Sequence, residues 1–96
     1  MELTLDDCVQ IPESVVSREL DGETVILNLE STVYFGLDAV GTRIWTLIQQ
    51  HGSLHQVFDK LQAEFPVDPG ILQKDLLDLT NRFCEKGLAR VTARSL

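Results

Sequence analysis

The strongest constraint on the fold is the turn dipeptide Asp21-Gly22, which separates two segments of strand-like composition. Asp-Gly readily adopts the positive φ angles of a type I′ turn, whose twist matches that of a two-stranded hairpin. The segments on either side, 15–20 and 23–29, supply the strands of that hairpin. A third strand-like segment, 32–35, follows after a short polar turn. The pattern therefore predicts a three-stranded antiparallel meander.

Alternation along the strands indicates which face is buried, because successive side chains point to opposite faces of a sheet. The apolar residues that share one face of the second strand are Val25, Leu27 and Leu29. Those that share one face of the third strand are Val33, Phe35 and Leu37. The opposite faces are mixed in character, so we expect these two apolar sets to face the core.

The remainder of the chain has helical periodicity, which predicts helices over 39–51, 54–65 and 69–86. A residue that favours the N-cap position precedes each one: Asp38, Ser53 and Asp68. Trp45 lies on the apolar side of the first helix and is expected in the core. The segments 8–11 and 88–91 are candidate short strands, and 92–96 are expected to be loose. The predicted fold class is α+β and winged-helix-like, a single domain over 1–96 with its core at 11–91.

The charge balance argues against nucleic acid as a partner. Eight basic residues stand against fifteen acidic ones, for a formal net charge of −7, whereas binding to phosphates needs clustered Lys and Arg. No apolar run approaches the ~18 residues of a membrane span. The N-terminus lacks the features of a signal peptide, so a cytoplasmic location is expected. In that setting Cys8 and Cys84 are expected to be free thiols.

No grouping of residues indicates catalysis. His51 and His55 are four positions apart, but Gly52-Ser53 interrupts the helix between them, so a metal site is not expected. The serines lack the context of a nucleophile, and the scattered glycines form no phosphate-binding loop. We therefore expect no catalytic residue, no metal and no cofactor, and the protein is not expected to be an enzyme.

The third strand is the most informative element for function. It is an outer strand of the predicted meander, and 32–35 contains neither Lys nor Pro, the residues that usually prevent pairing at an edge. Such an edge can bind an extended peptide as an added strand. Alternatively, the last helix, the N-terminal segment or a second copy of the chain covers it. The last helix favours the first hypothesis, because its apolar stripe is wider than one buried face requires.

Three segments, taken in order, resemble the PqqD-like family of recognition elements for ribosomally made, modified peptides. They are the hairpin 15–29, the Tyr-Phe-Gly-Leu segment that leads into Ile44-Trp45, and the final helix that ends in Lys86-Gly87-Leu88. The resemblance covers roughly residues 11–91. It is most similar to the stand-alone recognition proteins of lasso-peptide pathways, which work with a separate leader peptidase.

The resemblance implies that the chain binds the leader segment of a precursor peptide and presents it to a maturation enzyme. The leader would add as a strand between the third strand and the third helix. The strand residues that would line this groove are Thr32, Val33, Tyr34 and Phe35. The helix residues are Leu72, Asp75, Leu76, Leu79, Arg82 and Phe83, some of which must face the core instead.

Other functions stay open at this point. The chain also resembles PqqD itself, which would make it a peptide chaperone for a radical enzyme. A winged-helix regulator that binds DNA is a rival from another class, which the acidic balance disfavours. A third possibility is an enzyme subunit that dimerises through the free edge.

Overall fold

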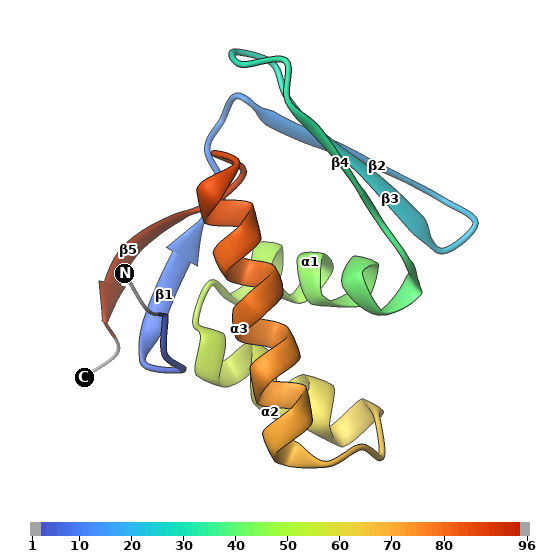
Figure 1. Ribbon diagram of the computed structural model, residues 1–96, viewed down its shortest axis with the longest axis vertical. Coiled ribbons are helices and arrows are strands. Elements are labelled where there is room, and N and C mark those ends of the chain that lie inside the picture. The colour runs from blue at the N-terminus through green and yellow to red at the C-terminus, as the bar shows by residue number, and fades with distance from the viewer. Residues whose placement is uncertain (1–2, 95–96) are drawn as a thin grey trace.

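The computed structural model describes residues 3–94 and confirms a meander followed by three helices (Figure 1). The five strands are β1 (Asp7–Gln10), β2 (Val15–Leu20), β3 (Glu23–Asn28), β4 (Tyr34–Leu37) and β5 (Arg90–Arg94). The three helices are α1 (Ala39–His51), α2 (Leu54–Glu64) and α3 (Pro69–Glu85). None of these helices is long and apolar enough to cross a bilayer.

The meander has the order β2-β3-β4, with both pairs antiparallel. Asp21 and Gly22 have φ angles of 55° and 81°, as the hairpin turn requires. The third strand begins later than predicted, at Tyr34 rather than Thr32. Thr32 has a φ of 60° and belongs to the turn, where its N–H donates to the carbonyl of Asn28 at 2.8 Å. The strand itself therefore runs from Tyr34 to Leu37.

A second, two-stranded sheet joins the two ends of the chain. β1 pairs antiparallel with β5, so the candidate strands near 8–11 and 88–91 form a ladder together. β5 begins at Arg90 and continues to Arg94, which corrects the expectation that 92–94 would be loose. Residues 95–96 lie outside the described part of the chain. This small sheet lies away from the meander (Figure 1).

The buried face of β3 is the opposite of the one predicted. The side chains of Thr24, Ile26 and Asn28 are buried, whereas Val25 and Leu29 are exposed. Register explains the difference, because Ile26 lies opposite Phe35, and residues directly opposite one another share a face. The polar Asn28 is tolerated there because its amide donates to the carbonyl of Gly87 and its side-chain oxygen accepts from two turn N–H groups.

The helices begin at the predicted caps. The side chains of Asp38, Ser53 and Asp68 accept hydrogen bonds from the first turns of α1, α2 and α3. α3 ends at Glu85, with Lys86 at its C-cap and Gly87 at a φ of 73°. Trp45 is buried as predicted, and its Nε1 donates to Ser17 Oγ at 3.1 Å, which ties α1 to the underside of the meander.

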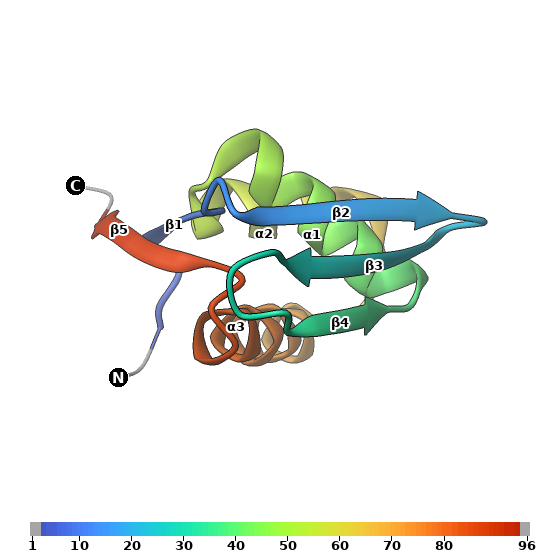
Figure 2. The same ribbon diagram turned by 90° about the horizontal axis from the view of Figure 1, so that it is seen from above.

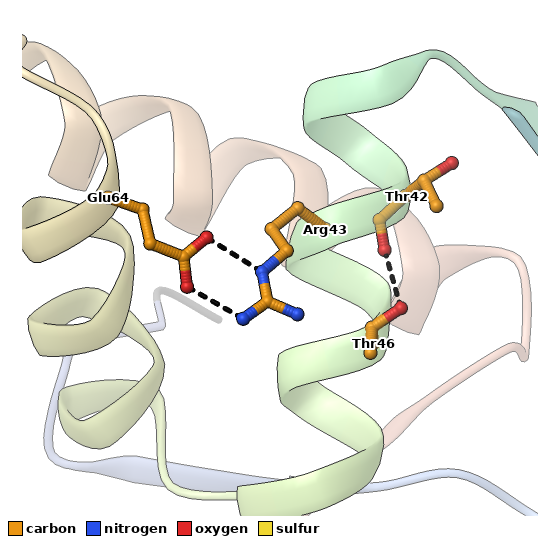
Figure 3. A network of polar contacts seen from close by, with 4 residues as sticks. All are labelled: Thr42, Arg43, Thr46 and Glu64. Carbon is orange, nitrogen blue, oxygen red and sulfur yellow. Dashed lines mark hydrogen bonds and ion pairs between the residues drawn. The ribbon is translucent and has the colours of Figure 1, made fainter. Parts of the chain in front are cut away.

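An ion pair links α1 to the far end of α2 (Figure 3). Arg43 Nε and Nη2 donate to the two carboxylate oxygens of Glu64 at 2.7 and 2.6 Å. This two-point contact raises the pKa of Arg43 and lowers that of Glu64. Because both side chains are well exposed, we expect it to orient the two helices more than to stabilise them.

Candidate functional site

β4 is an outer strand of the meander, and β3 is the only strand that pairs with it among the described residues. The other edge of β4 faces α3, which lies beside the strand (Figure 2). No other described segment pairs with that edge. The open edge on which the strand-addition hypothesis depends is therefore present within residues 3–94.

The hydrogen-bond register shows which groups β4 presents at that edge. In an antiparallel pair, alternate residues exchange both of their main-chain hydrogen bonds. Asn28 N–H donates to the carbonyl of Val33 at 2.8 Å, so the same pattern recurs at every second residue. The N–H and C=O groups of Phe35 and Leu37 thus point to β3. The N–H and C=O groups of Tyr34 and Gly36 point to the free edge, where an incoming strand can bond with them.

A cavity of about 550 Å³ opens between β4, the start of α1 and the middle of α3. We call it the β4–α3 groove. Its α3 wall consists of Asp75, Asp78, Leu79 and Arg82. Its other wall consists of residues 35–38 together with Val40, Gly41 and Ile44. Gly41 allows this packing, because a Cβ there would approach Leu37 Cδ2 to 3.0 Å.

Phe35 joins the groove to the core. Its ring packs edge-to-face on Phe83 at 5.8 Å, and Phe83 packs in the same way on Trp45 at 5.1 Å. On the groove side, the guanidinium of Arg82 lies 5.0 Å from the centre of the Phe35 ring. The rigid core therefore positions Phe35, and Arg82 forms part of the surface that a ligand would meet.

The charges of the groove have both signs. Asp78 accepts from Lys74 Nζ at 2.9 Å, one turn earlier on α3, and this bond raises the pKa of Lys74. The side chain of Asp75 makes no hydrogen bond or ion pair with any other described residue. Together with Arg82, these side chains present two carboxylates and one cation to a ligand. A helix with such mixed charge is a poor candidate for reading the anionic backbone of DNA.

The structure divides the predicted site residues into two groups. Tyr34, Phe35, Asp75, Leu79 and Arg82 lie at the edge of β4 or line the groove. Leu72, Leu76 and Phe83 are buried in the core, which revises their predicted role. On α3 these three lie on the side that packs against the other elements of the core, so they support the groove from behind.

Thr32 and Val33 precede β4 and do not line the groove, so their predicted place in the strand was wrong. The prediction also left out Gly36, Asp78 and Val40. The two-residue shift of the strand would have brought in Gly36. The helical spacing of Asp78 from Asp75 and Arg82 would have indicated the other carboxylate.

Within residues 3–94, the remaining candidates for chemistry have no partners that would form a site. His51 and His55 are exposed, and no cluster there of three or more His, Cys, Asp or Glu side chains could hold a metal. Cys8 and Cys84 are free, as predicted. Partial burial raises the pKa of the Cys84 thiol, which disfavours the reactive thiolate.

The sequence of this chain matches the model of a known protein family. Residues 23–89 match the family model for coenzyme PQQ synthesis protein D (PqqD). This segment runs from the start of β3 to the residue before β5 and includes both walls of the groove. The chain belongs to the PqqD family. No curated protein sequence matches it.

Two solved structures resemble this PqqD-family protein. One is TbiB1 in complex with the TbiA(beta) leader peptide, with 38% sequence identity and a TM-score of 0.81 over 88% of this chain and 98% of that one. The other is a lasso peptide synthetase B1 complexed with its leader peptide, with 21% identity and a TM-score of 0.75 over 85% and 96% of the two chains. The second shows a shared fold, and the first also supports membership of the family.

Proposed function

We propose that this protein binds the leader segment of a ribosomally made precursor peptide as a strand added to β4. The observation that carries the proposal is the free edge at Tyr34 and Gly36, which lies beside the β4–α3 groove. Main-chain bonds to those two residues supply affinity that is independent of sequence, and side chains seated in the groove supply selectivity. TbiB1, of the same fold and 38% identical, was solved with a leader peptide.

Residues within reach of such a peptide are fewer than the sequence suggested. The strand would pair with Tyr34 and Gly36, and the ligand side chain opposite Phe35 would point into the groove, since directly opposite residues share a face. There it would meet Phe35, Leu79 and Arg82, with Asp75 and Asp78 at the rim. This arrangement suits an apolar ligand side chain flanked by polar or basic neighbours.

The role that follows is delivery without catalysis. A bound leader holds the rest of the precursor close to a maturation enzyme, which raises its effective concentration there. A leader peptidase of a lasso-peptide pathway is the partner we favour, in the cytoplasm. The shared fold with a lasso peptide synthetase B1 that was solved with a leader peptide supports this choice over a radical enzyme of the PqqD type.

The test removes one outward N–H from the edge. Tyr34→Pro deletes a donor that points away from β3, so the fold should tolerate it, as edge strands tolerate proline. We expect it to abolish binding of the TbiA(beta) leader peptide and of dodecapeptides selected from a random phage library, measured by fluorescence anisotropy. Tyr34→Ala is the matched control for the lost side chain and should retain most of the affinity.

Two results would contradict the proposal. If the wild-type chain binds neither the TbiA(beta) leader nor any selected peptide, the protein is not a peptide-binding module of this kind. If peptides bind Tyr34→Pro as tightly as the wild type, they bind elsewhere than at the edge of β4. Circular dichroism and thermal unfolding of each variant show whether the fold has been kept.

A further inference from the structure

Gly36, in the middle of β4, has no structural reason within residues 3–94 to be a glycine. It is absent from the residues with positive φ, which include Gly22, Gly52 and Gly87. A Cβ added to it would meet no atom within 4 Å. Glycine in a strand interior costs about 0.5–1 kcal/mol relative to alanine. The chain therefore carries a stability cost at Gly36 that neither its backbone conformation nor its own packing explains.

The surroundings of Gly36 suggest what the missing side chain makes room for. Gly36 lies opposite Val25 of β3, so a side chain at position 36 would project from the outer face of the meander, while the Gly36 backbone lines the groove. Val25 is 55% exposed, and Tyr34, which lies on the same outer face of the sheet in β4, is 74% exposed. Between Val25 and the free edge, the sheet thus presents bare backbone flanked by two exposed apolar groups.

The register determines which ligand residue lies there. Because the N–H and C=O of Gly36 point to the free edge, an antiparallel ligand strand places one residue directly opposite Gly36. The side chain of that residue lies on the outer face, as residues directly opposite share a face. Two strand spacings, roughly 9.6 Å, separate its Cα from that of Val25. A branched aliphatic side chain is too short to cross this gap, whereas an aromatic ring is long and flat enough.

We propose that Gly36 determines specificity: the ligand residue paired with it is aromatic, and its ring lies across Gly36 and contacts Val25. Aromatic side chains that cover a strand glycine from the neighbouring strand are a known stabilising device in β-sheets. The peptide is then held from both faces of the sheet, by an apolar side chain in the β4–α3 groove and by an aromatic ring on the outer face. This inference rests on the proposed function, because it needs a strand added to β4.

The test is a parallel selection on two proteins. Dodecapeptides are selected from a random phage library against the wild-type chain and against Gly36→Thr. Threonine fills the space above the strand, suits a β-conformation and adds little apolar surface. Amide NMR of one complex locates the ligand residue paired with residue 36. We expect Phe, Tyr or Trp to be enriched at that position in wild-type binders and not in Gly36→Thr binders.

A double-mutant cycle then measures the contact. Replacing the aromatic residue of one wild-type binder by alanine should weaken its binding about fivefold to the wild type, the size expected of a good cross-strand pair. The same replacement should change binding to Gly36→Thr less than about twofold. Leu20→Thr is the control, since Leu20 lies on the same outer face at the distant hairpin tip, where it pairs with Glu23. This variant should keep the full fivefold loss.

Each outcome decides between the two claims. If peptides bind at the edge but show no aromatic preference opposite Gly36, or if the alanine effect is the same in Gly36→Thr, the inference fails and the proposed function stands. If no peptide binds either protein, both fail. Gly36→Thr should unfold at the same temperature as the wild type or higher, because strand propensity favours threonine over glycine. This readout excludes misfolding as the cause of a changed selection.

Discussion

The guanidinium carbon of Arg82 lies 5.0 Å from the centre of the Phe35 ring, so a charged side chain of α3 covers the aromatic ring of the edge strand β4. Phe35 in turn packs on Phe83 in the core. Lys86 Nζ lies 5.9 Å from the centre of the same ring, so two cations at the C-terminal end of α3 contact Phe35. The contact with Arg82 joins the two walls of the β4–α3 groove. A ligand in the groove would meet a surface that the core already holds in place.

Removing that contact should cost a measurable amount of stability. We expect Arg82→Ala to lower the free energy of unfolding by about 0.5–1 kcal/mol, the size of a cation–π pair at an exposed site. Urea denaturation of the wild type, Arg82→Ala, Phe35→Leu and the double variant forms a cycle. In the Phe35→Leu background the Arg82→Ala effect should largely disappear. An equal loss in both backgrounds would show that Arg82 acts through some other contact.

Two leucines of α3 should separate binding from folding. Leu79 is half-buried and lines the groove, whereas Leu76 is fully buried. Leu79→Glu should weaken peptide binding at least about tenfold, because it replaces apolar contact area of roughly 1.5 kcal/mol or more by a charge, and it should leave the fold intact. Leu76→Ala should instead destabilise the protein by about 2–5 kcal/mol. Anisotropy titrations and thermal unfolding measure the two effects. Unchanged affinity in Leu79→Glu would show that the ligand does not enter the groove.

Hydrogen exchange should show an alternation along β4. The register directs the N–H groups of Phe35 and Leu37 toward β3 and those of Tyr34 and Gly36 toward the free edge. In the free protein we expect the amides of Tyr34 and Gly36 to exchange faster than that of Phe35. A bound peptide should slow the two outward amides and leave Phe35 nearly unchanged, as NMR-detected exchange can measure. Equal slowing of all of them would indicate general rigidification instead of strand addition.

The ion pair between Arg43 and Glu64 predicts a small dependence of stability on pH. Its hydrogen bonds hold the pKa of Glu64 below its ordinary value of 4.5. The stabilisation is therefore fully present above pH 4.5 and is lost as the pH falls through the lowered pKa. We expect Glu64→Gln to cost about 0.5 kcal/mol at neutral pH, since both partners are exposed, and nothing once Glu64 is protonated.

Denaturation at several pH values tests this dependence. Glu13→Gln is the control, because Glu13 is exposed and forms no ion pair with another described residue. A pH-independent effect of Glu64→Gln would mean that the charge of Glu64 is not the cause.

Local signals made most of the fold predictable from the sequence. The Asp21-Gly22 turn and the caps Asp38, Ser53 and Asp68 act on residues within a few positions of themselves, so the sequence determines them without knowledge of the rest of the chain. A three-stranded meander leaves one side of each outer strand without a partner, but the sequence left open whether another segment covers the edge of β4. The strand order of the folded chain decided that point for the described residues. The PqqD family itself was recognisable from the order of three short segments.

Longer-range contacts decided the rest. The core takes the β3 face of Thr24, Ile26 and Asn28 rather than the more apolar face of Val25, Leu27 and Leu29. The pairing with β4 and the position of α1 determine which face of the sheet is covered. The packing of α3 against the core buries Leu76 and places Leu79 in the groove, although both belong to one apolar stripe. Register also turns Tyr34 and Gly36 outward. These choices depend on residues far apart in the chain, and alternation within a single segment does not contain that information.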